Sequence, residues 1–375
     1  MINFHIENFK CYYNTDIPIN YLTVLAGANG NGKSTAIQAL LMMRNTYDMR
    51  MEEYADANIE LNGPYCLSLG TTLDVIPVEA ERNSKMVLSL SENNKFLASY
   101  TYPLSDEHAE LSLRLSEQRC LGDKEEMLLF KNAFYYLNAE RIGPRISQGI
   151  KMHKYANVGW QGEYCAQILA ENSSVRVFAV DKERAYDTEK SLDLLTQTQL
   201  WMQKLFPGII INSEINSKSL TAQISITHNY TSSGASVLST NVGFGVSYVL
   251  PLIITGLIAE KGTMMIVENP EAHLHPSAQT SIAEFLAKIA QTGVYVVVET
   301  HSDHFINGIQ IAVAEKQLAP QRVVIDYVNQ IKETHRPEIK PITLSEKAEL
   351  SEWPDGFFNQ TQKNYARLFN LRMNG

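Results

Sequence analysis

The segment from Thr23 to Thr35, TVLAGANGNGKST, constrains the fold of this chain more than any other. It follows the pattern G-x-x-x-x-G-K-[ST], with a short apolar run before it and a helix-prone run to about Arg44 after it. A strand, a glycine loop and a helix in this order are typical of a phosphate-binding loop. The glycines let backbone N–H groups approach phosphate oxygens, and the helix N-terminus adds partial positive charge. The segment therefore predicts binding of ATP or GTP, although a glycine-rich turn before an ordinary helix is the simpler alternative.

The residue types of this loop match the parts of a magnesium nucleotide. We expect Lys33 to reach the β- and γ-phosphates, Ser34 to ligate Mg²⁺ and Thr35 to contact the α-phosphate. Lys10, in the turn between two N-terminal strands, either assists the nucleotide or is a solvated edge residue. The residues expected to bind the nucleotide in this half of the site are Lys10, Asn29, Gly30, Asn31, Gly32, Lys33, Ser34 and Thr35.

Two later apolar strands each end in polar residues. The run 264–267 ends at Glu268, where a phosphate-loop protein needs the acid that holds Mg²⁺ through water. The run 294–300 precedes His301, which can reach a γ-phosphate. Because the carboxyl ends of parallel strands form a ligand crevice, we expect both residues beside the loop.

A second glycine pair opens an apolar helix upstream of these strands. Gly243, Gly245 and Ser247 lie at its expected N-terminus, where backbone N–H groups can bind an anion. A glycine-capped core helix is the alternative interpretation.

Together these segments resemble the ABC-type ATPase heads of the RecF, SMC and OLD group. The chain resembles more narrowly a set of compact prokaryotic predicted ATPases, whose relatives include ATPases of anti-phage defence systems such as Septu-type and OLD-like ones. The resemblance rests on Lys33-Ser34, NVGFGVS (241–247), VENPEAHLHP (267–276), ETHSDH (299–304), an AERIGPR loop (139–145), a GWQGEY loop (159–164) and a C-terminal WPDGFF motif (353–358).

This resemblance implies an α/β fold, the P-loop NTPase head of ABC type, with a mostly parallel core sheet, an antiparallel β meander and a helical lobe. It implies a cytoplasmic homodimer, or higher homo-oligomer, around two ATP molecules with Mg²⁺. Gly243 to Ser247 of one protomer would face the phosphate loop of the other. The function it implies is an ATP-switched regulatory or sensor subunit of a defence system, which controls a partner effector encoded nearby.

Three departures from the family pattern affect the expected activity. Related heads carry a second acid at the position of Asn269, where it polarises the attacking water. An amide can orient water but cannot accept its proton, so we expect slow hydrolysis unless Glu271 or His301 substitutes. The expected catalytic set is Lys33, Glu268, Asn269, Glu271 and His301. The signature is not LSGGQ, and no Q-loop glutamine is evident.

The alternation of apolar and polar residues sets the expected domain boundaries. We expect an ATPase head over residues 1–322 and a small C-terminal segment over 323–375. Within the head, a β meander is expected at about 85–135 and a helical lobe at about 160–206, including an amphipathic helix over 187–206.

Two other functions are weighed against this one. A RecF-like DNA-binding repair or sensor ATPase would use the basic run Arg141, Arg145, Lys151 and Lys154, although these arginines could equally be structural and the net charge of −9 argues against chain-wide affinity for nucleic acid. A metal-dependent hydrolase would use His273, His275, His301, Asp303 and His304. Because residues 302–375 carry no D-x-D, we do not expect nuclease activity in cis.

Composition gives the expected compartment. The sequence has no apolar run of about 18 residues, so no membrane span is expected. Its four cysteines form no C-x-x-C pair and suggest neither a zinc ribbon nor a disulfide framework, which fits a reducing cytosol.

Overall fold

The computed structural model describes residues 1–49, 57–80, 84–104, 109–228, 237–238, 243–353 and 360–373. None of the helices within these ranges is both long and apolar enough to cross a membrane.

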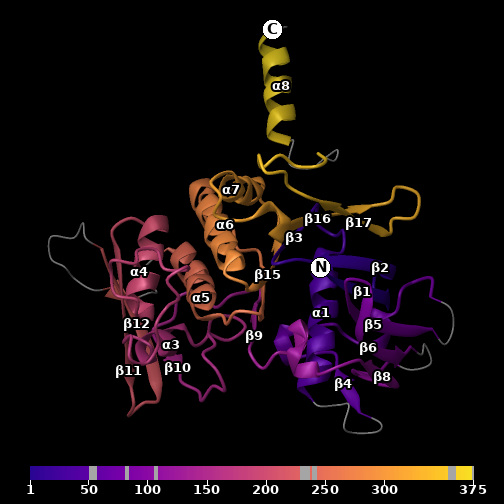
Figure 1. The fold of residues 1–375 in the computed structure, drawn as a ribbon, viewed down its shortest axis with the longest axis horizontal. Coiled ribbons are helices and arrows are strands. Elements are labelled where there is room, and N and C mark those ends of the chain that lie inside the picture. Colours follow the sequence, from indigo (N-terminus) through magenta and orange to yellow (C-terminus); the bar gives the residue numbers. More distant parts are fainter. Residues whose placement is uncertain are drawn as a thin grey trace.

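A six-stranded sheet forms the centre of the molecule (Figure 1). Its order is β17 (Pro337–Ile342), β16 (Val323–Gln330), β3 (Leu22–Ala26), β15 (Tyr295–Thr300), β14 (Met264–Glu268) and β9 (Phe134–Leu137). All neighbours are parallel except β16 and β17. The inner strands are buried on both faces, which explains why they are nearly continuous apolar runs. The parallel pairing places the phosphate loop and the ends of β14 and β15 at one edge.

Helices cover both faces of this sheet. Helix α1 (Lys33–Asp48) packs on one face, in a hydrophobic cluster that includes Leu25 and Leu40. Helices α5 (Phe244–Ile258), α6 (Pro276–Gln291) and α7 (Asp303–Ala314) pack on the other, in a cluster that includes Val24 and Phe285. Adjacent residues of β3 therefore point into different cores, as the twofold period of a strand requires.

The predicted meander is part of a larger antiparallel sheet. Its order is β2 (Tyr12–Ile19), β1 (Ile2–Phe9), β5 (Lys85–Glu92), β6 (Lys95–Pro103) and β8 (Glu117–Cys120). The meander thus extends the N-terminal hairpin and shares the core of α1. The short β7 (Ser112–Arg114) leaves this sheet and pairs with β4 (Asn58–Glu60). Single turns of helix complete this half: η2 (Pro64–Cys66), α2 (Thr72–Val75), η3 (Lys124–Glu126) and η4 (Leu128–Phe130).

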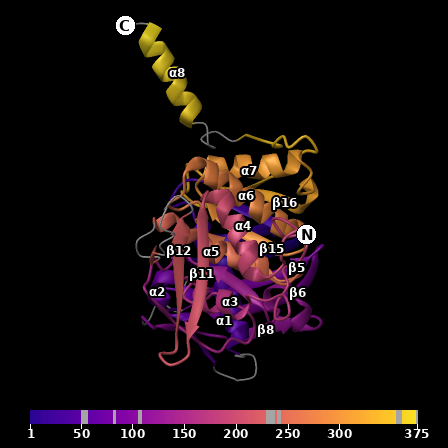
Figure 2. The same ribbon diagram turned by 90° about the vertical axis from the view of Figure 1, so that its left-hand side faces the viewer.

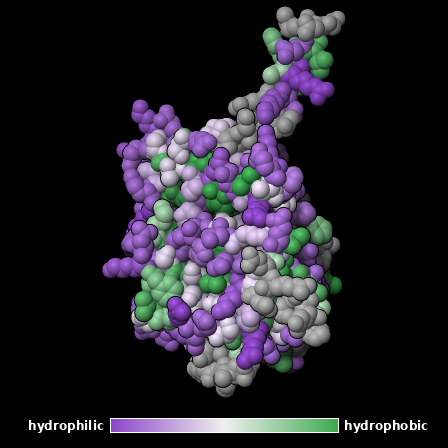
Figure 3. Space-filling model, turned by 90° about the vertical axis from the view of Figure 1, so that its right-hand side faces the viewer, coloured by the Kyte–Doolittle hydropathy of each residue, from purple (hydrophilic) through white to green (hydrophobic). Residues whose placement is uncertain are grey.

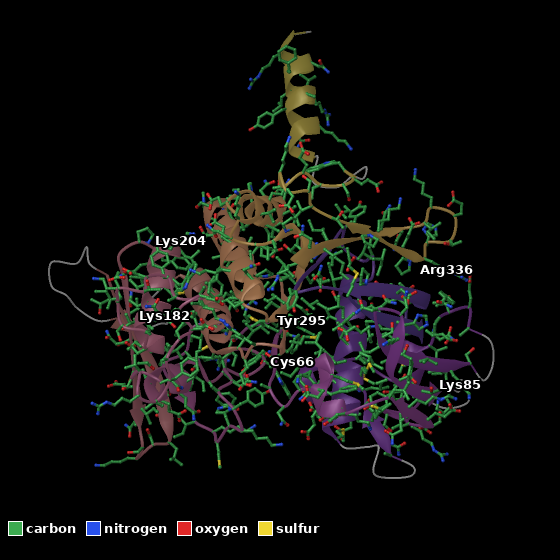
Figure 4. All side chains as sticks on the ribbon, viewed as in Figure 1. Cys66, Lys85, Lys182, Lys204, Tyr295 and Arg336 are labelled. Atoms are coloured by element: carbon green, nitrogen blue, oxygen red, sulfur yellow. The ribbon has the colours of Figure 1, made fainter. Side chains whose placement is uncertain are left out.

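A lobe on the opposite side contains a third sheet (Figure 2). It consists of β10 (Gln148–Gly149), β12 (Thr221–His228), β11 (Ile209–Asn216) and β13 (Val237–Leu238), with α3 (Cys165–Glu171) and α4 (Leu194–Leu205) beside it. In Figure 4, Lys182 and Lys204 mark this lobe, Lys85 marks the antiparallel sheet, and Cys66 and Tyr295 lie in the middle of the molecule between them.

The predicted helix over 187–206 was too long at its start. Helix α4 begins at Leu194, because the side chain of Asp193 caps it by accepting a hydrogen bond from the N–H of Thr196, at 2.9 Å. The buried Gln197 amide donates to the carbonyls of Asp187 and Ser191 and holds that segment as a loop. Sequence periodicity does not report this side-chain anchoring.

The C-terminal part of the chain begins with η6 (Pro320–Arg322), β16 and β17 and ends with α8 (Gln360–Met373). Trp353 is exposed, and residues 354–358 of the WPDGFF motif lie outside the described residues. Helix α8 projects away from the body in two perpendicular views (Figures 1 and 2). The side of the body shown in Figure 3 is mostly hydrophilic, with small separate groups of hydrophobic residues.

Candidate phosphate-binding site

The loop between β3 and α1 lies against β16, and two of its glycines are required by close approaches. Gly27 has a φ of +143°, and a Cβ there would lie 2.2 Å from the carbonyl oxygen of Val328. Gly32 has a φ of +105°, and a Cβ there would lie 3.0 Å from the Cys11 sulfur. Side chains at these positions would displace the loop, so its shape depends on glycine.

Hydrogen bonds from neighbouring strands fix the loop from outside. The Asn31 amide donates to the carbonyl of Val328 at 3.1 Å, and the Tyr12 hydroxyl donates to the carbonyl of Gly32 at 3.1 Å. Asn31 is buried, so its side chain belongs to the support of the loop and leaves the backbone N–H for a ligand. The predicted contact of Asn31 with the nucleotide stays a prediction, with its backbone N–H as the donor.

Lys33 and Ser34 are the first two residues of α1, and the side chains of both donate hydrogen bonds within the protein. The Lys33 ammonium donates to the carbonyls of Gly27 and Ala28, at 2.9 and 2.7 Å. Burial lowers its pKa. The Ser34 hydroxyl donates to Oε1 of Glu299 at 2.8 Å. The loop is thus braced by the same groups that are expected to hold phosphate and cation.

A cavity of about 560 Å³ opens over this loop. It is bounded by the loop, the turn after β1 and the ends of β14 and β15. Its lining residues are Lys10, Cys11, Asn29, Gly30, Gly32, Lys33, Ser34, Thr35, Ala139, Glu268, Asn269, Glu299 and His301. The structure therefore brings together Glu268, Asn269 and His301 with all sequence-predicted residues of the first half except Asn31. Lys10 lies beside them, with its ammonium donating to the Gln38 side chain at 3.0 Å.

Glu268 is held at the side of the cavity away from the loop. The Tyr136 hydroxyl, on β9, donates to its Oε1 at 2.7 Å, and the Asn138 amide donates to that hydroxyl at 2.8 Å. Burial raises the pKa of Glu268 to about 7. Without a cation this carboxyl is therefore partly protonated near neutral pH.

Asn269 follows with a left-handed backbone, at a φ of 44°. This conformation suits asparagine better than most residues. Its N–H donates to the carbonyl of Glu299 at 2.9 Å, which ties the ends of β14 and β15 together. Its side-chain oxygen is buried and has no hydrogen-bond partner among the described residues, as expected of a group positioned for water or ligand.

Arg141 binds the backbone of the same turn, and this corrects the sequence-based expectation that it could contact nucleic acid. It is 3% exposed, and its guanidinium donates to the carbonyls of Glu268 and Asn269, at 3.1 and 2.6 Å. It also lies 5.6 Å from the ring centroid of Tyr248 in α5. A side chain so enclosed cannot contact a nucleic-acid backbone, so the structural alternative holds for Arg141. Arg145, Lys151 and Lys154 are exposed.

Replacing Arg141 with methionine is expected to lower the free energy of unfolding by about 3 kcal/mol. Two charge-assisted hydrogen bonds disappear, and the two carbonyls that accepted them stay buried. Urea unfolding measures the loss. Arg145→Ala, in the same loop but on the surface, is the matched control and should change stability by less than about 0.5 kcal/mol. Equal effects for both variants would contradict a structural role of Arg141.

Glu271 and His301 are joined by a hydrogen bond next to the end of β15. The backbone N–H of His301 donates to Oε1 of Glu271 at 2.7 Å, and the His301 Nε2 lies 3.9 Å from Oε1 of Glu299. Burial and the positive charge of Lys33 lower the pKa of His301. A neutral imidazole can accept a proton, and the role of His301 as a base stays a prediction.

The two glycines of the predicted signature lie outside this cavity. Gly243 and Phe244 are exposed at the start of α5, whereas Gly245 is buried, where a Cβ would lie 2.9 Å from the carbonyl oxygen of His273. Neither glycine nor Ser247 lines the cavity of its own chain.

His273 and His275, two of the ligands expected for a metal-dependent hydrolase, make other contacts in the structure. His273 packs against the rings of Phe244 and Tyr248, and His275 caps α6. Over the part of the chain that the structure describes, no three His, Cys, Asp or Glu residues are grouped so as to hold a metal ion. Magnesium at a nucleotide differs, because phosphates and water supply most of its ligands.

Glu299 and Tyr136 are functional candidates that the sequence reasoning missed. Glu299 had a usable signal, since it lies near the end of the buried strand β15, directly before Thr300 and His301. Tyr136 had none, because its role depends on β9 pairing with β14 from more than a hundred residues away.

Comparisons with known proteins agree with this geometry. The family model of the AAA ATPase domain matches residues 1–199 and 180–306, and that of the protein family of unknown function DUF3696 matches residues 318–368. The Old nuclease of Escherichia phage P2 is 26% identical over 98 residues, which are 24% of this chain and 17% of that protein.

Solved structures show the same fold. An Smc head bound to the C-terminal winged-helix domain of ScpA matches with a TM-score of 0.53 and 13% identity, over 92% of this chain and 98% of that one. An Smc head with an extended coiled coil, bound to the C-terminal domain of ScpA derived from Pyrococcus furiosus, matches with a TM-score of 0.50 and 11% identity, over 99% and 100%. The fold is therefore that of an ABC-type P-loop ATPase head.

Proposed function

Because this chain belongs to the AAA ATPase domain family and is an ATPase of the RecF, SMC and OLD type, we propose that it is an ATP-dependent dimerising switch with slow hydrolysis. Its task is to act as the regulatory or sensor subunit of a prokaryotic anti-phage defence system and to control a partner effector. The link to defence and to the effector is supported by the resemblance to OLD-like and Septu-type ATPases.

One observation carries the dimerisation proposal. The cavity over the phosphate loop is lined by the turn after β1, the loop and the ends of β14 and β15, and the exposed N-terminus of α5 is absent from it. A helix N-terminus is a ready anion-binding group, and Gly243 leaves its backbone N–H groups uncovered. A second copy of the chain can supply this element to the open side of the cavity. Each nucleotide would then be enclosed by two protomers.

The residues present fit Mg²⁺. The Ser34 hydroxyl lies at the loop, Glu268 and Glu299 border the cavity, and Oε2 of Glu299 is buried without a hydrogen-bond partner in the part of the chain that the structure describes. Bound Mg²⁺ supplies charge neutralisation between the phosphates. Lys33 then adds a positive charge from the loop side.

Asn269 supports the slow turnover. It stands where a proton acceptor is expected and offers an amide. Its orientation is fixed by the bond from its N–H to Glu299 and by Arg141 on its carbonyl. A water molecule held by Asn269 keeps its proton unless another group accepts it. Hydrolysis is then slow, and the nucleotide holds the two protomers together for most of the time that it is bound.

Gly243→Glu tests the switch. Nothing lies within 4 Å of a Cβ at Gly243 and its φ is −58°, so the single protomer accommodates the change. The acid would repel a nucleotide presented by the partner. We expect unchanged ATP binding per protomer and loss of the ATP-induced doubling of mass in light scattering, with Gly243→Ala as a matched control that still dimerises. ATP binding by the wild-type protein without any change of mass would refute the dimer.

A further inference from the structure

We propose that Glu299 is the carboxylate that shares the magnesium ion with Ser34, and that Glu268 takes the outer position beside Tyr136. This assignment deepens the proposed function and rests on ATP binding at the loop. It concerns the residue before the last one of β15, the strand next to the phosphate-loop strand, and it differs from the sequence-based expectation that Glu268 is the acid that holds Mg²⁺.

Strand order places Glu299 closer to the loop. In the central sheet Glu268 pairs with Glu299, and Glu299 pairs with Leu25, so the three residues form one row across β14, β15 and β3. Residues paired in this way point to the same face, and neighbouring strands are about 4.8 Å apart. Glu268 is thus a full strand further from the loop than Glu299.

The hydrogen bonds agree with this order. Ser34 Oγ lies 2.8 Å from Oε1 of Glu299, whereas Oε1 of Glu268 accepts from the Tyr136 hydroxyl at 2.7 Å. Tyr136 is fixed in turn by the Asn138 amide. Glu268 is therefore held toward β9, and the hydroxyl expected to ligate Mg²⁺ is held by Glu299.

The second oxygen of Glu299 points to a missing cation. Glu299 is 3% exposed, and its Oε2 has no hydrogen-bond partner among the residues that the structure describes. The nearby cationic groups make no hydrogen bond to this oxygen, since Lys33 donates to the carbonyls of Gly27 and Ala28 and the His301 Nε2 lies 3.9 Å from Oε1. A buried carboxylate without a partner is costly. A divalent ion beside Ser34 would remove that cost.

A purely structural role makes a different prediction. If Glu299 served to orient the Ser34 hydroxyl, glutamine would replace it, because its amide oxygen accepts the same hydrogen bond. A cation, in contrast, needs the negative charge. Glu299→Gln therefore separates the two roles while keeping the shape of the side chain.

The test is ATP binding by calorimetry over a range of Mg²⁺ concentrations, for the wild type, Glu299→Gln and Glu268→Gln. We expect Glu299→Gln to raise the Mg²⁺ concentration for half-maximal binding by about 10-fold or more. Glu268→Gln should raise it less. ATP binding in EDTA should be unchanged or tighter in Glu299→Gln, because a negative charge next to the phosphates is gone. Electron paramagnetic resonance of Mn²⁺ bound with ATP gives a readout independent of turnover.

The outcomes are distinct. A wild-type Mg²⁺ requirement in Glu299→Gln overturns the assignment, and so does a larger shift in Glu268→Gln. Glu299→Asp, which keeps the charge but shortens the side chain, should raise the requirement severalfold and decides the matter if the glutamine variant does not fold. Absence of ATP binding by the wild type, with or without Mg²⁺, would refute the proposed function itself.

Discussion

Replacing Lys33 with alanine is expected to weaken ATP binding by about 100-fold or more and to abolish ATP-induced dimerisation. A charge-assisted hydrogen bond to phosphate contributes about 1.5–3 kcal/mol, and Lys33 can make more than one. The structure adds a second cost, because Lys33 also bonds to the carbonyls of Gly27 and Ala28 and so braces the loop. Calorimetric titration with Mg²⁺–ATP measures the loss of affinity.

Lys10→Ala is the matched control for this variant. Lys10 lines the same cavity and is also partly buried, but its ammonium donates to Gln38 and not to the loop. Its removal should weaken ATP binding by about 10-fold or less. If Lys33→Ala bound ATP with wild-type affinity, nucleotide binding at this loop would be refuted, and the switch with it.

Replacing Asn269 with glutamate is expected to raise the rate of ATP hydrolysis by about 100-fold. General-base catalysis contributes about 10²–10⁴-fold, and the amide of Asn269 cannot provide it. Steady-state phosphate release measures the rate, and the lifetime of the ATP-bound dimer should shorten accordingly. Fast hydrolysis by the wild-type protein, at the rate of an active transporter head, would contradict the role of Asn269.

The left-handed backbone conformation of Asn269 determines which control variant is suitable. Asn269 has a φ of 44°, a conformation that costs most residues about 1–2 kcal/mol and that Asp tolerates better than Glu. Asn269→Asp therefore introduces a carboxylate with less strain, although it reaches less far. If both variants hydrolyse ATP at the wild-type rate while remaining folded, Glu271 or His301 already serves as the base, and the clamp interpretation fails.

The phosphate loop and the strand that ends in Glu268 could be predicted from local sequence. The glycines of the loop belong to a motif of adjacent residues, and the buried strands are recognisable as apolar runs. The family resemblance extended this to the ABC-type fold, which the comparisons confirm. The antiparallel sheet was harder, because nothing in the meander itself reveals that β5 pairs with β1.

The contacts among site residues were decided by tertiary structure. Arg141 reads as a surface cation in a loop, yet the pairing of β9 with β14 brings it beneath the turn at Asn269. Its burial, and the loss of its predicted contact with DNA, follow from that pairing. The same strand places Tyr136 against Glu268.

The sequence by itself determined that this chain has a phosphate-binding loop, an acid at the strand end at Glu268 and an amide at position 269, because each depends on residues adjacent in the chain. Only the tertiary structure decided which acid meets Ser34. The order of strands in a sheet is set by long-range packing, and one strand's width separates Glu299 from Glu268. That distance is the reason why the Ser34 hydroxyl donates to Glu299, whereas Glu268 accepts from Tyr136 on β9.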